Sequence, residues 1–202
     1  MTGAEGVLLV ANCVYATSYV VTRLVLHDVA PATMAFVRLA VAGLVLLPLL
    51  RTASGRPPMS AADRRAVALM GLLGFAAAYA LSNWGLERST ATNAALLIAV
   101  EPITLVVLSP LMLGERLRGR ERLAAAAAIT GATLVVVNGV PGVTAEFAPH
   151  WRGDALLVLA GAAYAAYTLF GRGVLSRHPA AAVTTWSILW GAAAMLPLAA
   201  AE

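Results

Sequence analysis

Seven apolar runs, each about 20 residues long, divide the sequence and strongly constrain its fold. They cover residues 5–26, 31–50, 66–86, 91–113, 121–140, 153–173 and 180–199. A bilayer core about 30 Å thick is crossed by about 20 helical residues that rise about 1.5 Å each. The runs are too long for strands and lack a two-residue alternation, which favours helices over a barrel. The sequence therefore predicts an all-α integral membrane protein, a multi-span helical bundle.

The composition and the spread of charge exclude several other classes of protein. Hydrophobic residues make up 60% of the chain and charged residues 12%, whereas soluble domains carry about 25% charged residues. The basic residues are all arginines, and they lie in short segments between the runs without forming one basic face, so we expect no nucleic-acid partner. The single cysteine, Cys13, lies within the first run, and the three histidines are far apart. We therefore expect no disulfide, no metal site and no cofactor.

The arginines also predict how the chain is oriented. The segments after the second, fourth and sixth runs hold Arg51, Arg56, Arg64, Arg65, Arg116, Arg118, Arg120, Arg122, Arg172 and Arg177, whereas the alternate segments hold only Arg88 and Arg152. By the positive-inside rule, the N-terminus and the arginine-rich segments face the cytoplasm. We therefore expect a multi-pass protein of the bacterial inner (plasma) membrane. Arg23 lies near the end of the first run, where we expect it to extend to the lipid headgroups.

One acidic residue lies deep within the fourth run. Glu101 is ten residues in, near the bilayer midplane, where an ionisable group costs about 2.5–3.5 kcal/mol to insert and usually marks a functional site. Pro102 cannot donate to the carbonyl of Ile98, and Pro110 follows later, so both predict helix breaks. Such backbone is tolerated where it lines a cavity. We expect Glu101 to face a cavity and to take up and release a proton; the alternatives are a structural carboxyl satisfied by neighbours such as Thr104, or a protonated residue that holds helices together.

Further polar and aromatic residues lie deep in the other runs and share helical faces. Helical spacing places Asn12, Tyr15 and Tyr19 on one face and Tyr79 and Asn83 on another. A wall of aromatic rings with a few polar groups is typical of small-ligand sites. The predicted substrate-binding residues are Asn12, Tyr15, Tyr19, Arg38, Tyr79, Asn83, Glu101 and Tyr164.

Other roles for these residues stay open at this point. Arg38 either extends to the lipid interface or pairs with Glu101 or a substrate carboxylate. Tyrosines near helix ends often anchor in the interface, and asparagines often bond across helices.

The chain also repeats itself at an offset of 148 or 149 residues. Tyr15, Tyr19, Arg23, Leu26, Pro31 and Pro48 have counterparts in Tyr164, Tyr167, Arg172, Leu175, Pro179 and Pro197. Because five helices per copy is an odd number, the second copy enters the membrane inverted, a construction found in transporters. This interpretation gives a first five-helix repeat over residues 1–140, a periplasmic linker over 141–152, and the start of a second, inverted repeat over 153–202.

Several short motifs resemble the EamA-type branch of the drug/metabolite transporter superfamily. They are the Glu101-Pro102 pair, the sequence Leu113-Gly114-Glu115-Arg116, Gly131, and Pro31 leading to Arg38. The resemblance implies ten helices in two inverted halves, and the export or exchange of small metabolites, amino acids or drugs by alternating access. About seven of those ten helices are then present here.

The sequence leaves two functional hypotheses. The first is a transporter, expected to be an exporter, of a small solute, in which Glu101 couples transport to protons. The alternative is a truncated or half-transporter protein that is inactive alone or completes its bundle with a partner chain, for example as a homodimer. An enzyme is not expected, because no second acid, metal ligand or nucleophile lies at the depth of Glu101.

Overall fold

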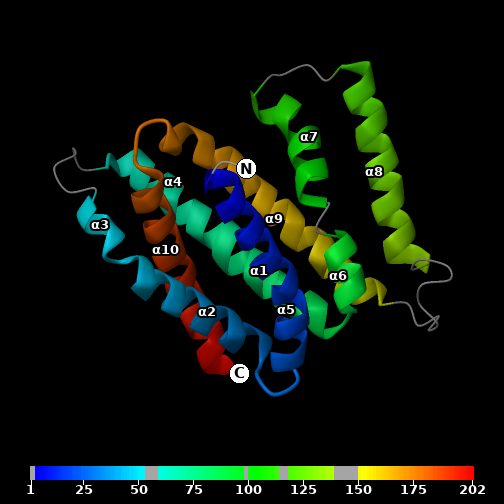
Figure 1. Ribbon diagram of the computed structural model, residues 1–202, viewed down its shortest axis with the longest axis horizontal. Helices are drawn as coiled ribbons and strands as arrows, with labels where there is room; N and C mark the ends of the chain where they lie inside the picture. The colour runs from blue at the N-terminus through cyan, green and yellow to red at the C-terminus, as the bar shows by residue number, and fades with distance from the viewer. Residues whose placement is uncertain (1–2, 53–58, 98–99, 114–117, 139–149) are drawn as a thin grey trace.

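The computed structural model of the chain describes residues 3–52, 59–97, 100–113, 118–138 and 150–202. Within these ranges the regular elements are all helical, and no strand is present (Figure 1). They are α1 (Gly3–Val25), α2 (Pro31–Leu46), α3 (Leu49–Thr52), α4 (Ala61–Met70), the π-helix η1 (Gly71–Ala77), α5 (Ala78–Glu87), α6 (Ala91–Leu97), α7 (Val100–Leu113), α8 (Gly119–Asn138), α9 (Trp151–Leu175) and α10 (Ala180–Ala201). The all-helical prediction is confirmed for this part of the chain.

Four helical segments are long and apolar enough to cross a membrane. Among the described residues these are Glu5–Val25, Ala61–Glu87, Trp151–Leu175 and Ala180–Ala201, by length and composition. The segments Pro31–Leu46 and Ala91–Val107 are apolar but shorter. The predicted spans at 31–50, 91–113 and 121–140 therefore stay predictions.

Local features of the sequence account for two of the helix starts. The backbone N–H of Asp63 donates to the Ser60 hydroxyl at 3.1 Å, so Ser60 caps α4. Pro31 is the first residue of α2. The N–H at this position has no partner within a helix, so its absence in proline costs no helical hydrogen bond. The second predicted unit, which we placed from residue 153, begins with α9 at Trp151. Most of the predicted linker lies outside the described residues.

The segment Ala61–Glu87 is one rod built from α4, η1 and α5, and it packs closely against α9 and α10. A Cβ atom added to Gly71 would collide with the carbonyl oxygen of Ser187 in α10, and one added to Gly74 would collide with the Tyr167 ring. Glycines at such crossings let helix backbones approach closely. The rod is therefore packed tightly against both α9 and α10.

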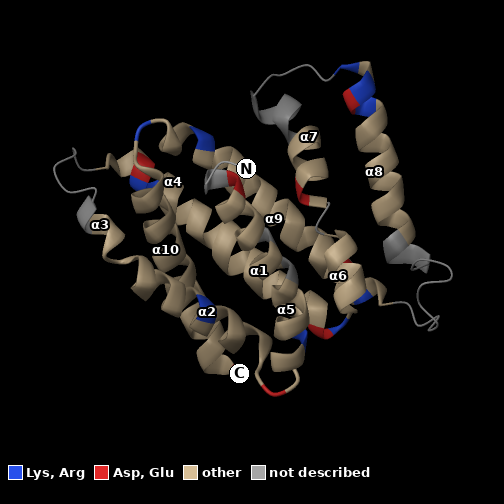
Figure 2. Cartoon of the chain, viewed as in Figure 1, with Lys and Arg blue, Asp and Glu red and all other residues tan. Residues whose placement is uncertain are grey.

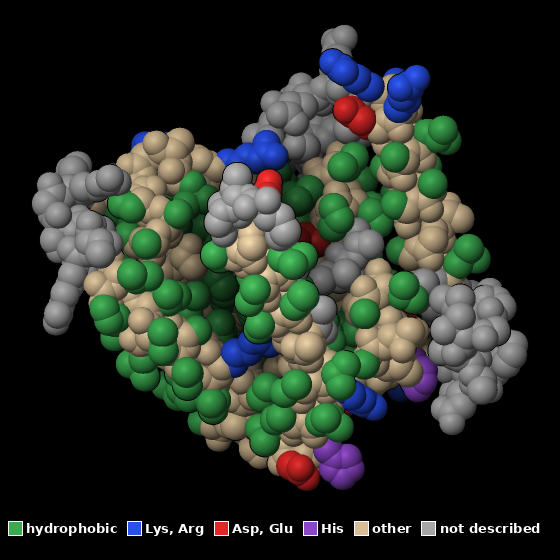
Figure 3. All heavy atoms as spheres, in the orientation of Figure 1, with side chains coloured by type: hydrophobic (Ala, Val, Ile, Leu, Met, Phe, Trp, Pro, Cys, Tyr) green, Lys and Arg blue, Asp and Glu red, His purple; other side chains and the backbone are tan. Residues whose placement is uncertain are grey.

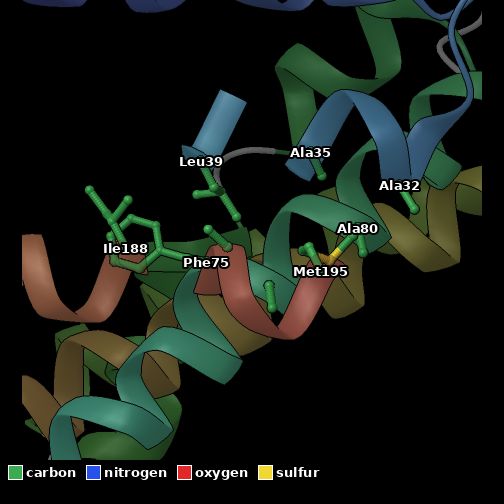
Figure 4. Packing of buried hydrophobic residues seen from close by; sticks show 9 residues of the cluster. Ala32, Ala35, Leu39, Phe75, Ala80, Ile188 and Met195 are labelled. Atoms are coloured by element: carbon green, nitrogen blue, oxygen red, sulfur yellow. The ribbon is translucent and has the colours of Figure 1, made fainter. Parts of the chain in front are cut away.

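The largest apolar core lies between α2, the middle of the rod and α10 (Figure 4). Its buried members are Ala32, Ala35, Leu39, Phe75, Ala76, Ala80, Ile188, Ala192 and Met195. Five of the nine are alanines, so the helices come close while larger side chains fill the gaps between them.

Side-chain contacts at the helix ends show the direction in which each helix runs. Asp154, in the first turn of α9, bonds to Ser89 just after α5, and Glu202, just after α10, bonds to Ala32 at the start of α2. We call this the Asp154 end. At the opposite, Asp63 end, Arg177 after α9 pairs with Asp63 of α4. The end of α1 also lies at the Asp154 end, because Arg23 bonds to the last carbonyls of α5. Hence α9 runs opposite to α1, and α10 runs opposite to α2. An inverted repeat requires these directions, but the repeat itself stays a prediction.

Arg23 differs from its expected role. Its Nη1 donates to the carbonyl oxygens of Leu86 at 2.6 Å and Glu87 at 2.7 Å, so it caps the C-terminal end of α5. The last carbonyls of a helix have no partner within the helix, and a guanidinium at that position satisfies them. Most other charged side chains also gather near the two ends of the bundle, with exceptions on α2 and at the start of α7 (Figure 2).

Candidate functional site

A cavity of about 340 Å³ lies between α1, α2, the rod, α6, α7 and α9. Pockets for small organic ligands have volumes of about 300–1,000 Å³, so the cavity is large enough for a small solute. The molecular surface is hollowed beside α1 (Figure 3). The cavity walls include seven of the eight predicted substrate-binding residues: Tyr15, Tyr19, Arg38, Tyr79, Asn83, Glu101 and Tyr164. The eighth, Asn12, belongs to α1, but its side chain lies outside the described residues.

Glu101 lies in the first turn of α7, half-buried, beside the α9 backbone at Gly161. A Cβ added to Gly161 would lie 3.4 Å from the Glu101 nitrogen, so the two helices are nearly in contact there. The expected alternative partner, Thr104, instead donates its hydroxyl to the Val100 carbonyl at 2.8 Å. Within the described chain, no hydrogen bond or ion pair to the Glu101 carboxyl is seen. Glu101 therefore lines the cavity without a carboxyl partner among the described residues.

The two prolines of this region differ in their surroundings. Pro102 lies in α7 two residues after Val100, and Ile98, whose carbonyl it cannot bond, lies outside the described residues. The helix break expected at Pro102 therefore stays a prediction. Pro110 does not end the helix, because α7 continues through it to Leu113.

Arg38 projects from α2 into the same cavity. Its guanidinium carbon lies 4.8 Å from the centre of the Tyr79 ring, which is cation–π geometry. No ion pair joins Arg38 to Glu101 among the residues that the structure describes. The cavity therefore contains one cation and one acid that do not neutralise each other in a direct contact.

Aromatic rings from three helices form much of the cavity wall. The Tyr15 and Tyr19 rings meet edge to face at 5.8 Å, and their hydroxyl oxygens are 3.3 Å apart. The Tyr164 ring lies 5.3 Å from the ring of Tyr167, also on α9.

Asn83 is buried, and its amide nitrogen donates to the Pro31 carbonyl at 2.9 Å. Asn83 therefore joins α5 to the start of α2 as well as lining the cavity.

Sequence reasoning did not assign several other residues of the wall. Ser18, Thr22 and Ser82 add hydroxyls, and Ala160 with Gly161 forms the small-residue surface of α9. Ser18 and Thr22 follow Tyr15 at helical spacing, so the face that carries the tyrosines could have identified them. Ala160 and Gly161 give no such signal, because alanine and glycine occur throughout the apolar runs.

Comparison with known proteins gives a consistent family. Residues 3–137 match the model of the EamA-like transporter family. A protein of Streptantibioticus cattleyicolor named a probable terminal-alkyne amino-acid exporter is 29% identical over 199 residues, which cover 98% of this chain and 64% of that protein. An uncharacterized transporter of Archaeoglobus fulgidus is 26% identical over 194 residues, 95% of this chain and 65% of the relative. This chain thus spans slightly less than two thirds of the length of either relative.

No solved structure matches the chain. Because the family match covers more than half of the residues and agrees with the Glu101-Pro102 and Pro31-to-Arg38 motifs, the chain belongs to the EamA-like transporter family.

Proposed function

We propose that the chain forms the solute-binding part of a membrane transporter that exports small zwitterions of the amino-acid type. The observation that carries the proposal is the charge arrangement of the cavity, in which Arg38 and Glu101 line one space without pairing with each other. A solute carboxylate would bind the guanidinium of Arg38, and a solute ammonium would bind the carboxyl of Glu101. The amino-acid exporter named above supports this class of solute.

The aromatic wall would contact the part of the solute that carries no charge. Tyr15, Tyr19 and Tyr164 offer ring faces and hydroxyls, which suit a short apolar side chain with little hydrogen bonding of its own. The volume of about 340 Å³ suits a solute of the size of a single amino acid or a small drug.

Transport by alternating access requires the cavity to open at one end of the bundle at a time. We propose that a proton exchanges with the solute at Glu101, which lies in the cavity without a hydrogen-bond partner in the described chain.

We further propose a bacterial inner-membrane location with a cytoplasmic N-terminus, which the arginine distribution supports.

Binding of three related probes to the purified protein tests the proposed solute. A neutral amino acid carries both charges, its N-acetyl derivative keeps only the carboxylate, and its amide keeps only the ammonium. We expect Arg38→Gln to weaken the binding of the amino acid and of the N-acetyl acid and to leave the binding of the amide unchanged. Glu101→Gln should weaken the binding of the amino acid and of the amide and leave the binding of the N-acetyl acid unchanged.

The control for this experiment is the exposed pair of Glu87 and Arg88, whose charges meet at 2.5 Å outside the cavity. Glu87→Gln and Arg88→Gln remove the same charges and should leave the binding of all three probes unchanged. If Arg38→Gln and Glu101→Gln each reduce the affinity for all three probes equally, the assignment of one charged residue to each end of a zwitterion is wrong.

A second candidate is a half-transporter that completes its bundle with another chain. It is favoured by α1, which lines the cavity through Tyr15 and Tyr19 and yet leaves Val10, Val14 and Leu24 more than 60% exposed on its other face. The mass of the native complex, measured in detergent, separates the two candidates. A monomer that binds the amino acid would exclude the half-transporter.

A further inference from the structure

The cavity wall contains three serine or threonine residues, and two of their hydroxyls have no partner in the described chain. The three are Ser18 and Thr22 of α1 and Ser82 of α5. The Ser18 hydroxyl donates to the Tyr15 carbonyl of its own helix at 2.6 Å. The hydroxyls of Thr22 and Ser82 make no hydrogen bond within the part of the chain that the structure describes. Two hydroxyls thus line the cavity unpaired.

Hydroxyls on the helices of this chain commonly bond back to their own helix. A helical serine or threonine can donate to a carbonyl three or four residues earlier. Six threonines outside the cavity wall do so at 2.7–3.2 Å: Thr17, Thr104, Thr130, Thr133, Thr168 and Thr185. Thr22 and Ser82 differ from these six both in lining the cavity and in lacking this bond.

The burial of the two hydroxyls makes the missing bonds costly. Thr22 is only 6% exposed, and Ser82 is half-buried. A buried hydroxyl without a partner costs free energy, and in native proteins such a group usually has a specific explanation. An acceptor on a solute in the cavity would remove the cost for both residues.

Both hydroxyls lie on the side of the cavity that contains Arg38. The Arg38 guanidinium carbon lies 4.8 Å from the centre of the Tyr79 ring, and Ser82 follows Tyr79 by three residues, so it lies on the same face of α5. The Arg38 charge also acts on the Tyr19 hydroxyl, and Thr22 follows Tyr19 by three residues on α1. Ser82 and Thr22 are therefore one helical turn from the two tyrosines nearest to Arg38.

Thr22 and Ser82 also lie at similar heights on neighbouring helices. Arg23, the residue after Thr22, donates to the Leu86 carbonyl at 2.6 Å. Leu86 follows Ser82 by four residues, which is about one turn of α5. The two hydroxyls therefore come from adjoining walls of the cavity.

This side of the cavity offers hydrogen-bond donors. The guanidinium of Arg38 makes no hydrogen bond within the described residues, so its N–H groups add to the two hydroxyls. Glu101, the acid of the cavity, lies instead beside Gly161 of α9. An ionised carboxylate only accepts hydrogen bonds and has about four positions for them. A guanidinium supplies two donors in a fork, and each hydroxyl supplies one more.

We propose that the hydroxyls of Ser82 and Thr22 donate to the carboxylate of the solute beside the Arg38 guanidinium. The proposal rests on the proposed function, because it takes the solute to be a zwitterion whose carboxylate binds Arg38. Ser82 and Thr22 are then solute-binding residues that set how the zwitterion lies across the cavity. Its carboxylate points toward α1, α2 and α5, and its ammonium points toward Glu101 on α7.

Binding of the amino acid, its N-acetyl derivative and its amide to the purified protein tests these two residues. Ser82→Ala and Thr22→Val each remove one hydroxyl with little change in size. We expect each to weaken the binding of the amino acid and of the N-acetyl acid by about 10-fold or more, as for the loss of a hydrogen bond to a charged group. The binding of the amide should be unchanged. Thr22→Ser keeps the hydroxyl and should retain most of the affinity.

Two matched controls remove hydroxyls that lie outside the cavity wall. Thr17→Val makes the same change on α1, and Ser176→Ala makes the same change as Ser82→Ala just after α9. Both hydroxyls bond to nearby carbonyls, at 2.8 and 2.9 Å. The controls should leave the binding of all three probes unchanged. If one of the two cavity variants does not fold, as judged by its circular dichroism, the other carries the test alone.

Three other patterns of binding would each overturn the proposal. Equal losses for all three probes would assign the effect to the shape of the cavity. Losses for the amino acid and the amide, with the N-acetyl acid unchanged, would make the hydroxyls acceptors for the ammonium. Unchanged binding of all three probes by Ser82→Ala and Thr22→Val would show that these hydroxyls do not contact the solute.

The Arg38→Gln and Glu101→Gln proteins separate this failure from a failure of the proposed function. If those two variants keep their opposite preferences among the probes while Ser82→Ala and Thr22→Val show none, only the assignment of the two hydroxyls is wrong. If the unmodified protein binds none of the probes, or if Arg38→Gln and Glu101→Gln weaken all three equally, the proposed solute is wrong. The assignment of the hydroxyls is then wrong with it.

Discussion

Arg177 donates from the turn after α9 to the Asp63 carboxylate of α4 at 2.5 Å, and His178 lies 3.1 Å from the other oxygen of the same carboxylate. The Ser60 hydroxyl donates to that second oxygen as well, at 2.9 Å. Asp63 therefore joins the start of the rod to the turn between α9 and α10. It is the counterpart, at the Asp63 end, of the link that Asp154 makes at the other end.

Removing the Asp63 link should lower stability. We expect Asp63→Asn to lower the thermal unfolding midpoint, because Arg177 and His178 lose their anionic partner and the α9–α10 turn loses its attachment to α4. Arg65→Gln, an exposed charge change two residues further along α4, is the control and should have little effect. Equal midpoints for Asp63→Asn and the unmodified protein would show that this link contributes no stability.

Glu202 should contribute stability that depends on pH. Burial raises the pKa of its carboxyl, but hydrogen bonds from the Thr33 and Ala32 backbone N–H groups outweigh burial and leave that pKa below its usual range. A carboxyl with a lowered folded-state pKa stabilises the fold above its unfolded-state pKa, and this stability is lost as the pH falls through the folded-state value. Glu202→Gln should therefore lower the unfolding midpoint near neutral pH and have no effect in strong acid.

Thermal unfolding at a series of pH values checks this prediction. His27→Gln, a change in an exposed side chain near the same end, serves as the control. A difference between Glu202→Gln and the unmodified protein that grew as the pH fell would contradict the predicted sign.

Gly71 should be nearly irreplaceable in the rod. A methyl group there would overlap the Ser187 carbonyl and lie 2.7 Å from the Trp190 Cβ, so Gly71→Ala must separate η1 from α10. Overpacking of this kind costs about 1–3 kcal/mol. Gly131→Ala in α8 is the matched control, because nothing lies within 4 Å of its added Cβ. It should be neutral or stabilising by up to about 1 kcal/mol, since alanine favours helix over glycine. Unfolding in denaturing detergent measures both, and equal stabilities would contradict the tight crossing.

Tyr79 should position Arg38 for solute binding. Tyr79→Leu removes the ring beneath the guanidinium, which is worth about 0.5–2 kcal/mol, and should weaken amino-acid binding by about 2- to 30-fold. Tyr79→Phe keeps the ring and should retain most of the affinity. Equal losses in both variants would assign the effect to the Tyr79 hydroxyl, contrary to this prediction.

The faces of the helices could be predicted from the sequence because helical spacing fixes them. Tyr15 and Tyr19 on one run, and Tyr79 and Asn83 on another, line one cavity as expected. The depth of Glu101 in a bilayer was predicted from its position within an apolar run, and that depth stays a prediction.

Contacts between distant parts of the chain could not be predicted in this way. Arg23 is near a helix end, and an interfacial position was the simplest expectation, but its partners are carbonyls more than 60 residues away. Asp154 is close to the start of α9, so its position in sequence resembles that of a surface residue, although it is buried against α5 and α6. No local pattern encodes such pairings, because they depend on how whole helices pack.

The π-helix in the middle of the rod sets the angular position of everything beyond it. Each N–H of η1 reaches one residue further back than in an α-helix. Rewinding Gly71–Ala77 as α-helix would therefore turn α5 about the rod axis by roughly 100° for each residue of changed register. Tyr79 would then leave the Arg38 guanidinium, and Asn83 would leave the Pro31 carbonyl. A change of winding in seven residues is thus sufficient to take the α5 side of the cavity away from α2.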